Sequence, residues 1–261
     1  MTMLAQLDVL HAVAGLLVGF LVGLTGVGGG SLMTPLLVLL FGVSPATAVG
    51  TDLLFASTTK IAGTFVHGVR ATVDWVIVRR LASGSVPAAV ITLVILARLG
   101  HPPAKANHTI LLALGAMLIL TAIATLFQKQ LAALAKRADH LEPRKTLLPT
   151  VVLGVVLGVA VTLSSVGAGA IGVTALLLLY PALRVAGIVG TDIAHAVPLT
   201  MIAGLGHWVI GDVNLALLVN LLIGSIPGVV AGSLLSTRSP DHVLRPALAV
   251  VLMISGYKLL A

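Results

Sequence analysis

The sequence has no cysteine, few charged residues and few aromatic residues. The absence of cysteine excludes disulfide bonds and thiolate metal ligands. Charged residues make up 9% of the chain, whereas a soluble domain carries about 25%. Hydrophobic residues make up 58% and the mean hydropathy is +1.16. The composition therefore predicts an integral membrane protein that crosses the bilayer several times.

Two catalytic signatures are also absent from the sequence. There is no Gly-Lys-Ser/Thr phosphate loop, which weighs against ATP hydrolysis, and no His-Glu-x-x-His motif, which weighs against a metalloprotease. We therefore expect no cofactor, no bound metal and no enzymatic activity. A formal charge of +7 is also found in proteins that bind nucleic acid. The basic residues form no continuous patch, so we expect no nucleic-acid partner and interpret the excess as membrane orientation.

A glycine-rich run interrupts the first long apolar segment, residues 7–41. It occupies residues 26–31, and a similar run occupies residues 163–170. Each glycine costs about 1 kcal/mol of helix propensity relative to alanine, so the helix is expected to stop in both runs. Irregular backbone at membrane depth is tolerated where it is buried in protein or lines a cavity, which makes both breaks candidate sites. The spaced glycines Gly15 and Gly19 are interpreted instead as close helix packing.

The second half of the sequence repeats the first. A shift of 140 residues places Gly50-Thr51-Asp52 on Gly190-Thr191-Asp192, and a shift of 139 places Gly15 on Gly154. We expect a first membrane repeat at 1–127, a polar connection at 128–147 and a second repeat at 148–261. The apolar segments that predict helices are 7–24, 31–42, 45–69, 74–98 and 106–127, then 148–164, 170–180, 182–210, 213–236 and 243–260.

The distribution of Lys and Arg bears on the membrane topology. If each broken segment turns back as a hairpin, eleven Lys and Arg residues fall on one side of the membrane and three on the other. If each broken segment crosses, the division is nine against five. Because basic residues accumulate on the cytoplasmic side, the stronger asymmetry favours hairpins. The sequence thus predicts an all-α membrane protein of two inverted repeats, each a broken, re-entrant helical hairpin plus three transmembrane helices. The central connection would be cytoplasmic and both termini outside.

Asp52 and Asp192 lie inside apolar segments, where a carboxylate is costly. A Thr-Asp pair can begin a helix. Ser44-Pro45 is a better start, however, and places Asp52 about two turns into its segment. The two acids either carry a coupling proton, accept hydrogen bonds from amides of the breaks, or make purely structural hydrogen bonds.

Lys60 lies near the middle of its segment, too deep to reach either surface easily. A fixed cation beside two helix N-termini favours an anionic substrate. The alternative is an ion pair with Asp52 that only orients the helices. Thr64 and His67 share the helix face of Lys60, and Thr200 occupies the equivalent position in the second repeat.

Among the histidines within the apolar segments, His67, His195 and His207 are the candidates for a functional role. Each could handle substrate or protons, although a lone histidine in a membrane span is more often a hydrogen-bonded packing residue. Arg79 and Arg80 could form an antechamber for the substrate or contact lipid head groups.

At these residues the chain resembles the TauE/SafE sulfite exporters, permeases for sulfur-containing and other small organic anions. The resemblance covers nearly the whole chain. It rests on Gly15-x-x-x-Gly19 leading into residues 26–31, on Pro35, on Ala48-Val49-Gly50-Thr51-Asp52, and on Gly167-Ala168-Gly169 and Gly190-Thr191-Asp192. It implies secondary transport of an anion across the cytoplasmic membrane, linked to the proton gradient. The resemblance does not identify the anion, because members handle sulfite, sulfoacetate and carboxylates.

These observations predict a proton-coupled exporter of a small anion such as sulfite, sulfoacetate or another organosulfonate or carboxylate, in the cell inner membrane. The anion, protons and membrane lipid are the expected partners, and the sequence does not indicate an oligomeric state. The alternatives are a non-transporting scaffold or sensor subunit and, less favoured, an intramembrane enzyme. The acids expected to couple protons or brace the breaks are Asp52 and Asp192. The residues expected to bind substrate are Gly28, Gly29, Gly30, Ser31, Lys60, Thr64, Gly167, Gly169 and Thr200.

Overall fold

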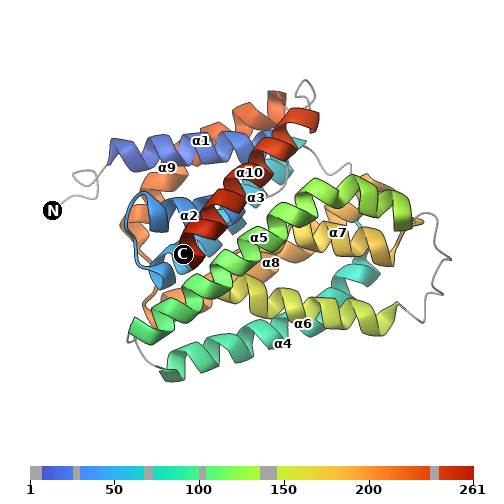
Figure 1. Ribbon diagram of the computed structural model, residues 1–261, viewed down its shortest axis with the longest axis horizontal. Helices are drawn as coiled ribbons and strands as arrows, with labels where there is room; N and C mark the ends of the chain where they lie inside the picture. The colour runs from blue at the N-terminus through green and yellow to red at the C-terminus, as the bar shows by residue number, and fades with distance from the viewer. Residues whose placement is uncertain (1–7, 26–29, 68–72, 100–103, 136–145, 236–240) are drawn as a thin grey trace.

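The protein is described by a computed structural model over residues 8–25, 30–67, 73–99, 104–135, 146–235 and 241–261. These residues form a bundle of α-helices (Figure 1) and include no strand, which confirms the all-α fold class. The helices are α1 (Val9–Thr25), α2 (Gly30–Leu39), α3 (Pro45–His67), α4 (Trp75–Leu99), α5 (Ala104–Ala135), α6 (Leu147–Ser164), α7 (Ala170–Leu179), α8 (Val185–Ile210), α9 (Leu215–Leu235) and α10 (Asp241–Leu260).

Five of the described helices are long and apolar enough to cross a membrane. They are α4, α5 over Ile110–Gln128, α6, α8 and α9, while α7 and the Val9–Leu24 part of α1 are shorter and apolar. Large apolar side chains such as Ile91, Val156 and Ile254 are exposed on the outside of the bundle. An outer surface of this kind suits a lipid environment, so the fold is that of a multi-pass membrane protein.

The second glycine run ends one helix and begins another. Ser165 follows α6 with φ 58°, and Gly167 and Gly169 both have φ 127° before α7 starts. Glycine enters this left-handed region at no steric cost, so the two glycines permit the break. The break predicted within residues 163–170 is thereby confirmed. In the first half α1 ends at Thr25 and α2 begins at Gly30; Gly28 and Gly29 lie outside the described residues.

Helix α5 extends farther than the sequence pattern predicts. The apolar segment ends at Phe127, yet α5 continues to Ala135. The added residues, Gln-Lys-Gln-Leu-Ala-Ala-Leu-Ala, contain no glycine or proline and are strong helix formers. Gln128 is therefore a helical residue and not the first residue of a polar connection.

Equivalent helices of the two halves pack in reciprocal pairs. α1 packs along α9 as α6 packs along α4, while α5 packs against α10 and α3 against α8. Glycine lets these helices approach closely. A Cβ on Gly19 would lie 2.5 Å from the carbonyl oxygen of Ser225, and one on Gly158 would lie 2.4 Å from that of Ser85. The prediction that the spaced glycines serve close packing is confirmed.

The threonine of each Thr-Asp pair holds the start of a helix from the other half. The amide of Asp74, before α4, donates to Thr191 Oγ1 at 3.0 Å, and the amide of Asn214, before α9, donates to Thr51 Oγ1 at 3.1 Å. Asp74 and Asn214 in turn accept amide hydrogen bonds from the first turns of α4 and α9. These helix starts are therefore fixed by side chains from the opposite half.

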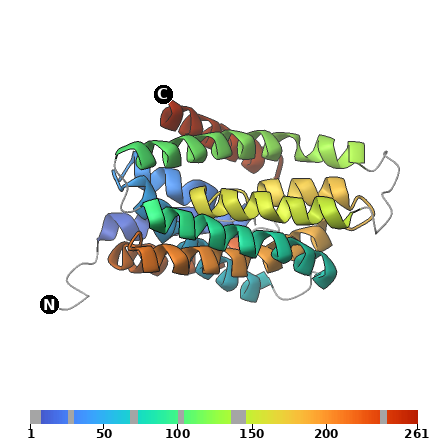
Figure 2. The ribbon, with the colours of Figure 1, turned by 90° about the horizontal axis from the view of Figure 1, so that it is seen from below.

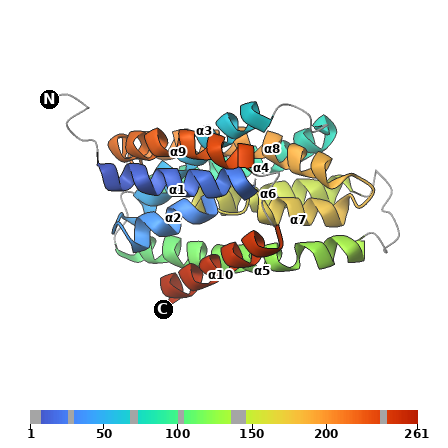
Figure 3. The ribbon, with the colours of Figure 1, turned by 90° about the horizontal axis from the view of Figure 1, so that it is seen from above.

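The two broken pairs of helices lie toward opposite ends of the bundle. In Figure 3, α1 and α2 lie in the left half, where α10 ends, and α6 and α7 lie farther to the right, where α5 ends. Figure 2 shows the same separation from the opposite side. Most residues of the second break, between α6 and α7, are buried, so this break lies deep within the protein.

The close packing of α1 on α9 can be tested with Gly19→Val. Because a Cβ at this position would overlap the Ser225 backbone, the helices must separate, at a cost on the order of 1–3 kcal/mol. We expect a lower midpoint of thermal unfolding in detergent. Leu17→Val, at an exposed position of the same helix, is the control and should leave the midpoint nearly unchanged. An equal midpoint for Gly19→Val and the wild type would contradict the packing.

Candidate functional site

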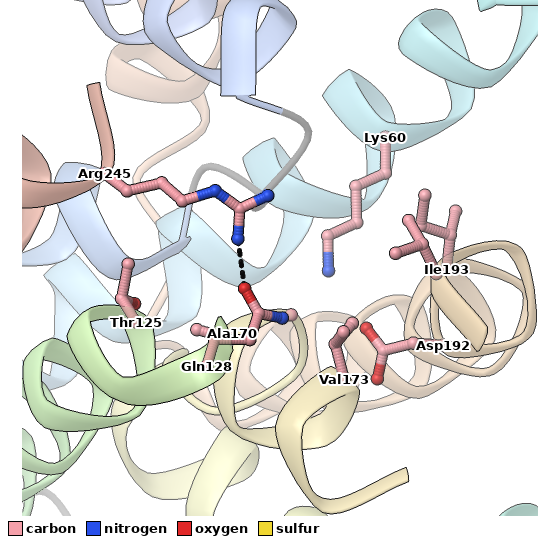
Figure 4. A pocket seen from close by; sticks show the side chains of 10 residues that line it. Lys60, Thr125, Gln128, Ala170, Val173, Asp192, Ile193 and Arg245 are labelled. Carbon is pink, nitrogen blue, oxygen red and sulfur yellow. Dashed lines mark hydrogen bonds between the residues drawn. The ribbon is translucent and has the colours of Figure 1, made fainter. Parts of the chain in front are cut away.

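A cavity of about 70 Å³ lies beside the second break, between α3, α5, α7, α8 and α10 (Figure 4). Buried Asp192, Gly169 and Val173 line its inner part, and half-buried Lys60 and Arg245 line the rest. One water takes up about 30 Å³ of the liquid. The cavity is therefore large enough for a small anion or a few waters.

Two cationic side chains reach this cavity from different helices. Figure 4 shows the ammonium of Lys60, on α3, and the guanidinium of Arg245, on α10, pointing toward the same space. The guanidinium donates a hydrogen bond to Oε1 of Gln128 on α5. This contact helps to fix the plane of the guanidinium, whose N–H groups match the oxygens of an oxyanion. The walls thus bring together two donors suited to a negative charge.

The first turn of α7 forms another wall of the cavity, through Gly169, Ala170 and Val173. Inside the break, the amide of Gly172 donates to the carbonyl of Gly167 at 3.1 Å, and that of Val173 donates to Gly169 at 2.8 Å. The N-terminal end of a helix carries partial positive charge and favours anions. The break therefore adds to the positive potential that Lys60 and Arg245 create.

The carboxylate of Asp192 lies directly against this turn. A Cβ on Gly172 would lie only 2.2 Å from Asp192 Oδ1, so a side chain at this position would require the carboxylate to move. Asp192 is 1% exposed, lines the cavity with Lys60 and interacts with its charge. The cavity thus contains two cations and one carboxylate among its described residues.

Asp52, the equivalent acid of the first half, has different surroundings. It is fully buried, and its Oδ2 accepts a hydrogen bond from Thr34 on α2. The hydroxyl of Ser165, at the end of α6, lies beside the same carboxyl group. Among the described residues, neither Asp52 Oδ1 nor Ser165 Oγ has a hydrogen-bond partner. Asp52 therefore lies between hydroxyl groups at the second break, whereas Asp192 faces a cation.

The two histidines of α8 make hydrogen bonds to neighbouring helices. His195 Nε2 lies 2.8 Å from Ser85 Oγ on α4, and His207 Nε2 lies 2.9 Å from the carbonyl oxygen of Thr162 in the last turn of α6. His207 Nδ1 also lies 3.4 Å from Asp212 Oδ2. Both rings are 1% exposed. These contacts are those of packing residues, and a role in substrate or proton handling stays a prediction.

Of the remaining predicted residues, Thr200 and Ser31 do not line the cavity, and the side chains of the others are not described. Thr200 is buried, but its hydroxyl donates to Ala196 within α8 and it does not line the cavity. Ser31 is half-buried, next to Gly30 at the start of α2. The side chains of Thr64 and His67 lie outside the part of the chain that the structure describes. Among the predicted substrate residues, the cavity brings together Lys60 and Gly169 and adds the predicted acid Asp192.

Sequence reasoning missed Arg245, Gln128 and Thr125, which line the same cavity. The charge distribution alone assigns Arg245 to membrane orientation, and the polar pattern places Gln128 in the connection. One signal was available: Arg245 lies just inside the apolar segment 243–260, about one turn after α10 begins at Asp241. Nothing in the sequence alone brings this residue to the second break.

The fold and this site define a class of protein, the multi-pass helical membrane transporters, in which broken helices meet charged side chains at an internal cavity. Residues 11–259 match the family described as Sulfite exporter TauE/SafE, so the chain belongs to that family. The family resemblance seen in the sequence is confirmed.

Individual relatives agree with this assignment. The chain is similar to "Probable membrane transporter protein YjnA" of Bacillus subtilis (strain 168), with 40% identity over 250 residues, covering 94% of this chain and 97% of the relative. It is also similar to "Probable membrane transporter protein YdhB" of the same organism, with 28% identity over 249 residues, covering 94% and 96%. No solved structure gives a significant match.

The contact between Gly172 and Asp192 gives a second test. Gly172→Ala would raise helix propensity by about 1 kcal/mol, yet its Cβ would force the Asp192 carboxylate to move. We expect a folded protein whose transport activity is strongly reduced. Ala175→Gly, in the same helix, is the control for helix propensity and should retain activity despite lower stability. Full activity in Gly172→Ala would show that the position of the carboxylate is unimportant.

Proposed function

We propose that the protein is a secondary transporter that carries a small anion across the cytoplasmic membrane, with sulfite, sulfoacetate or another organosulfonate or carboxylate as the substrate class. The observation that carries this proposal is the cavity at the second break. There Lys60, Arg245 and the N-terminal turn of α7 surround one space that can hold a small anion.

The cost of burying charge supports a functional role for these side chains. Charged residues within a membrane protein are expensive and mark substrate or ion pathways. Lys60 and Asp192 compensate each other in part, and Arg245 adds a second cation to the same cavity. An anion in the cavity balances the charge that remains. The anion binds between Lys60 and Arg245, with Gln128 positioning the guanidinium.

The transport is coupled to the proton gradient in this proposal. Asp52 and Asp192 supply two buried carboxyl groups next to the second break, one on the hydroxyl side and one in the cavity. Protonation of a buried carboxylate removes a negative charge that would otherwise repel the bound anion. A proton and an anion therefore move together more easily than the anion alone.

The proposal includes two inverted membrane repeats, residues 1–127 and 148–261, with a cytoplasmic connection between them. It is supported by the position of the two broken pairs toward opposite ends of the bundle (Figure 3) and by the eleven Lys and Arg residues that hairpins place on one side. In this arrangement the first break, with Gly28, Gly29, Gly30 and Ser31, corresponds to the second break with Gly167 and Gly169.

Transport can be measured in liposomes that contain only the purified protein. We expect wild-type protein to move sulfite or sulfoacetate in response to an imposed pH gradient. Lys60→Gln and Arg245→Gln should each lower the flux by roughly tenfold or more, because a hydrogen bond to a charged group contributes about 1.5–3 kcal/mol.

Arg98→Gln is the matched control for loss of a positive charge, because Arg98 is exposed at the end of α4. Its flux should equal that of the wild type. If the folded wild-type protein moves none of the small anions tested, the transport proposal fails and the scaffold or sensor function takes its place.

The proposed topology can be tested by cysteine labelling, since the natural chain has no cysteine. In cells, Ala138→Cys, in the central connection, should react with a membrane-impermeant maleimide only after the membrane is opened. Leu40→Cys, at an exposed position after α2, should react from outside. The reverse pattern would invert the orientation. Thr2→Cys, before the first broken segment, should react from outside if that segment is a hairpin, and reaction of Thr2→Cys only after the membrane is opened would rule out the hairpin.

A further inference from the structure

We infer that Arg80 and Tyr180 are positioning residues for transport. They join the start of α6 to the end of α7, the two ends of the second broken pair, and so hold the first turn of α7 at the anion cavity. The inference rests on the proposed transport function. It goes beyond that function because neither residue lines the cavity, and it gives Arg80 a role other than an antechamber or a lipid contact.

Hydrogen bonds connect three helices at this point. The guanidinium of Arg80, on α4, donates to Thr146 Oγ1 at 3.2 Å and to Tyr180 Oη at 3.3 Å. Tyr180 Oη lies 2.7 Å from Thr150 Oγ1, which donates to the Thr146 carbonyl oxygen at 2.6 Å. Thr146 is the N-cap of α6 and Tyr180 is the C-cap of α7. These four residues, the Arg80 cluster, therefore tie both ends of the broken pair to α4.

Each hydroxyl of the Arg80 cluster has one proton to donate, which fixes the direction of the bonds. Thr150 uses its proton on the Thr146 carbonyl, so its oxygen accepts from Tyr180, and the Tyr180 oxygen accepts from Arg80. Bonds in such a chain polarise one another. The two threonines are buried and the other two residues half-buried, so the chain is partly shielded from water. Removing the Tyr180 hydroxyl would interrupt the chain in its middle.

Tyr180 matters for α7 because the helix itself has few polar side chains. Residues 170–179 contain one, Thr174, and its hydroxyl has no partner among the described residues. Val173 packs in an apolar cluster with Leu81 of α4. Apolar packing is non-directional. The directional bonds at Tyr180 therefore add what the packing lacks, a defined position of α7 along its axis.

The Arg80 cluster and the anion cavity lie at opposite ends of α7. The helix starts at Ala170, next to Gly169 in the cavity wall, and Tyr180 follows its last residue. Its 10 residues form one element of about 15 Å. The cation of Arg80 also complements the partial negative charge at the C-terminal end of α7. A shift of Tyr180 along the axis is thus passed on to the turn whose amides favour the anion.

The first half holds its broken pair at corresponding positions with other chemistry. Asn220 occupies the position of Arg80 at a shift of 140, and its Oδ1 accepts from the amide of Asp8, just before α1, at 3.3 Å. In the first turn of α1, the ring of His11 stacks on Phe41, just after α2, with centroids 4.5 Å apart. Contacts of this kind in both halves indicate a shared requirement: the end of a broken pair that lies away from its break must be held.

Flux in liposomes tests the positioning role. Tyr180→Phe should raise the KM for the anion by roughly 2- to 10-fold, the range of one net hydrogen bond, at a nearly unchanged maximal rate. Arg80→Gln should raise KM at least as much. Because the two residues act in one chain, the double variant should raise KM no further than Arg80→Gln alone. A lower maximal rate with the KM of the wild type would mean a loss of folded protein only and would contradict the positioning role.

Two matched controls remove the same chemical groups elsewhere. Arg79→Gln removes the neighbouring charge, whose side chain is exposed and donates to the carbonyl oxygen of Trp75. Tyr257→Phe removes the hydroxyl of an exposed tyrosine on α10. Both variants should keep the KM of the wild type. If Arg79→Gln raised KM as much as Arg80→Gln, surface charge or lipid contact would explain the effect and the inference would fail.

Spin labels test the contact without any transport, since the natural chain has no cysteine. Labels at Leu148→Cys on α6 and Leu178→Cys on α7, both exposed, report the distance between the two helix ends. The distance distribution should broaden in Tyr180→Phe and stay narrow in Tyr257→Phe. An unchanged distribution in Tyr180→Phe would overturn the inference even where transport is confirmed. A broadened distribution in a protein that moves no anion would defeat the transport proposal, while the joining of the helix ends would stand.

Discussion

The rest of the structure depends on one constraint: a helix is interrupted at a depth where the bilayer supplies no water to its backbone groups. Every amide and carbonyl at such an interruption needs a partner from the protein. At the second break the carbonyl of Thr162 faces His207, the amide of Val166 meets the hydroxyl of Ser164, and the amide of Gly172 reaches back to Gly167. Because these backbone groups have partners, the facing ends of α6 and α7 can interact with other groups. The C-terminal end of α6 favours a positive charge, and the N-terminal end of α7 favours a negative charge. The cavity and the buried acids are arranged around this one interruption.

Composition and glycine spacing predict much of the fold. The apolar segments match the helices within a few residues, because in a membrane the hydrophobic length and the helix breakers dominate all other signals. The sequence pattern places the end of α5 too early. Polarity alone does not end a helix, and Gln128 and the residues that follow it to Ala135 are good helix formers. Of the residues that line the cavity, Lys60, Gly169 and Asp192 were predicted as site residues from buried charge and glycine. Arg245 was not, because its contact with Gln128 joins residues far apart in the chain.

The two halves share a framework but not a site. Thr51 and Thr191 perform the same task in each half, and the glycine contacts between α1 and α9 have equivalents between α4 and α6. The residues that could act on a substrate have diverged: Lys60 is matched by Thr200, His195 by Phe55, and Gly172 by Leu32. Repeated sequence thus preserves the contacts that hold the bundle. The charged cavity beside the second break combines Asp192, which has an equivalent in the first half, with Lys60, at which the copies differ.

The pairing of α1 with α9 has a consequence for biogenesis. A membrane protein is inserted as it is synthesised, from the N-terminus onward. The glycine face of α1 cannot pack against α9 until α9 has left the ribosome. The hydrogen bond from the Asn214 amide to Thr51 cannot form before that point either. For most of translation the first half therefore stays in the membrane with an unfilled contact surface. A chain interrupted before α9 would lack the helix that covers this surface.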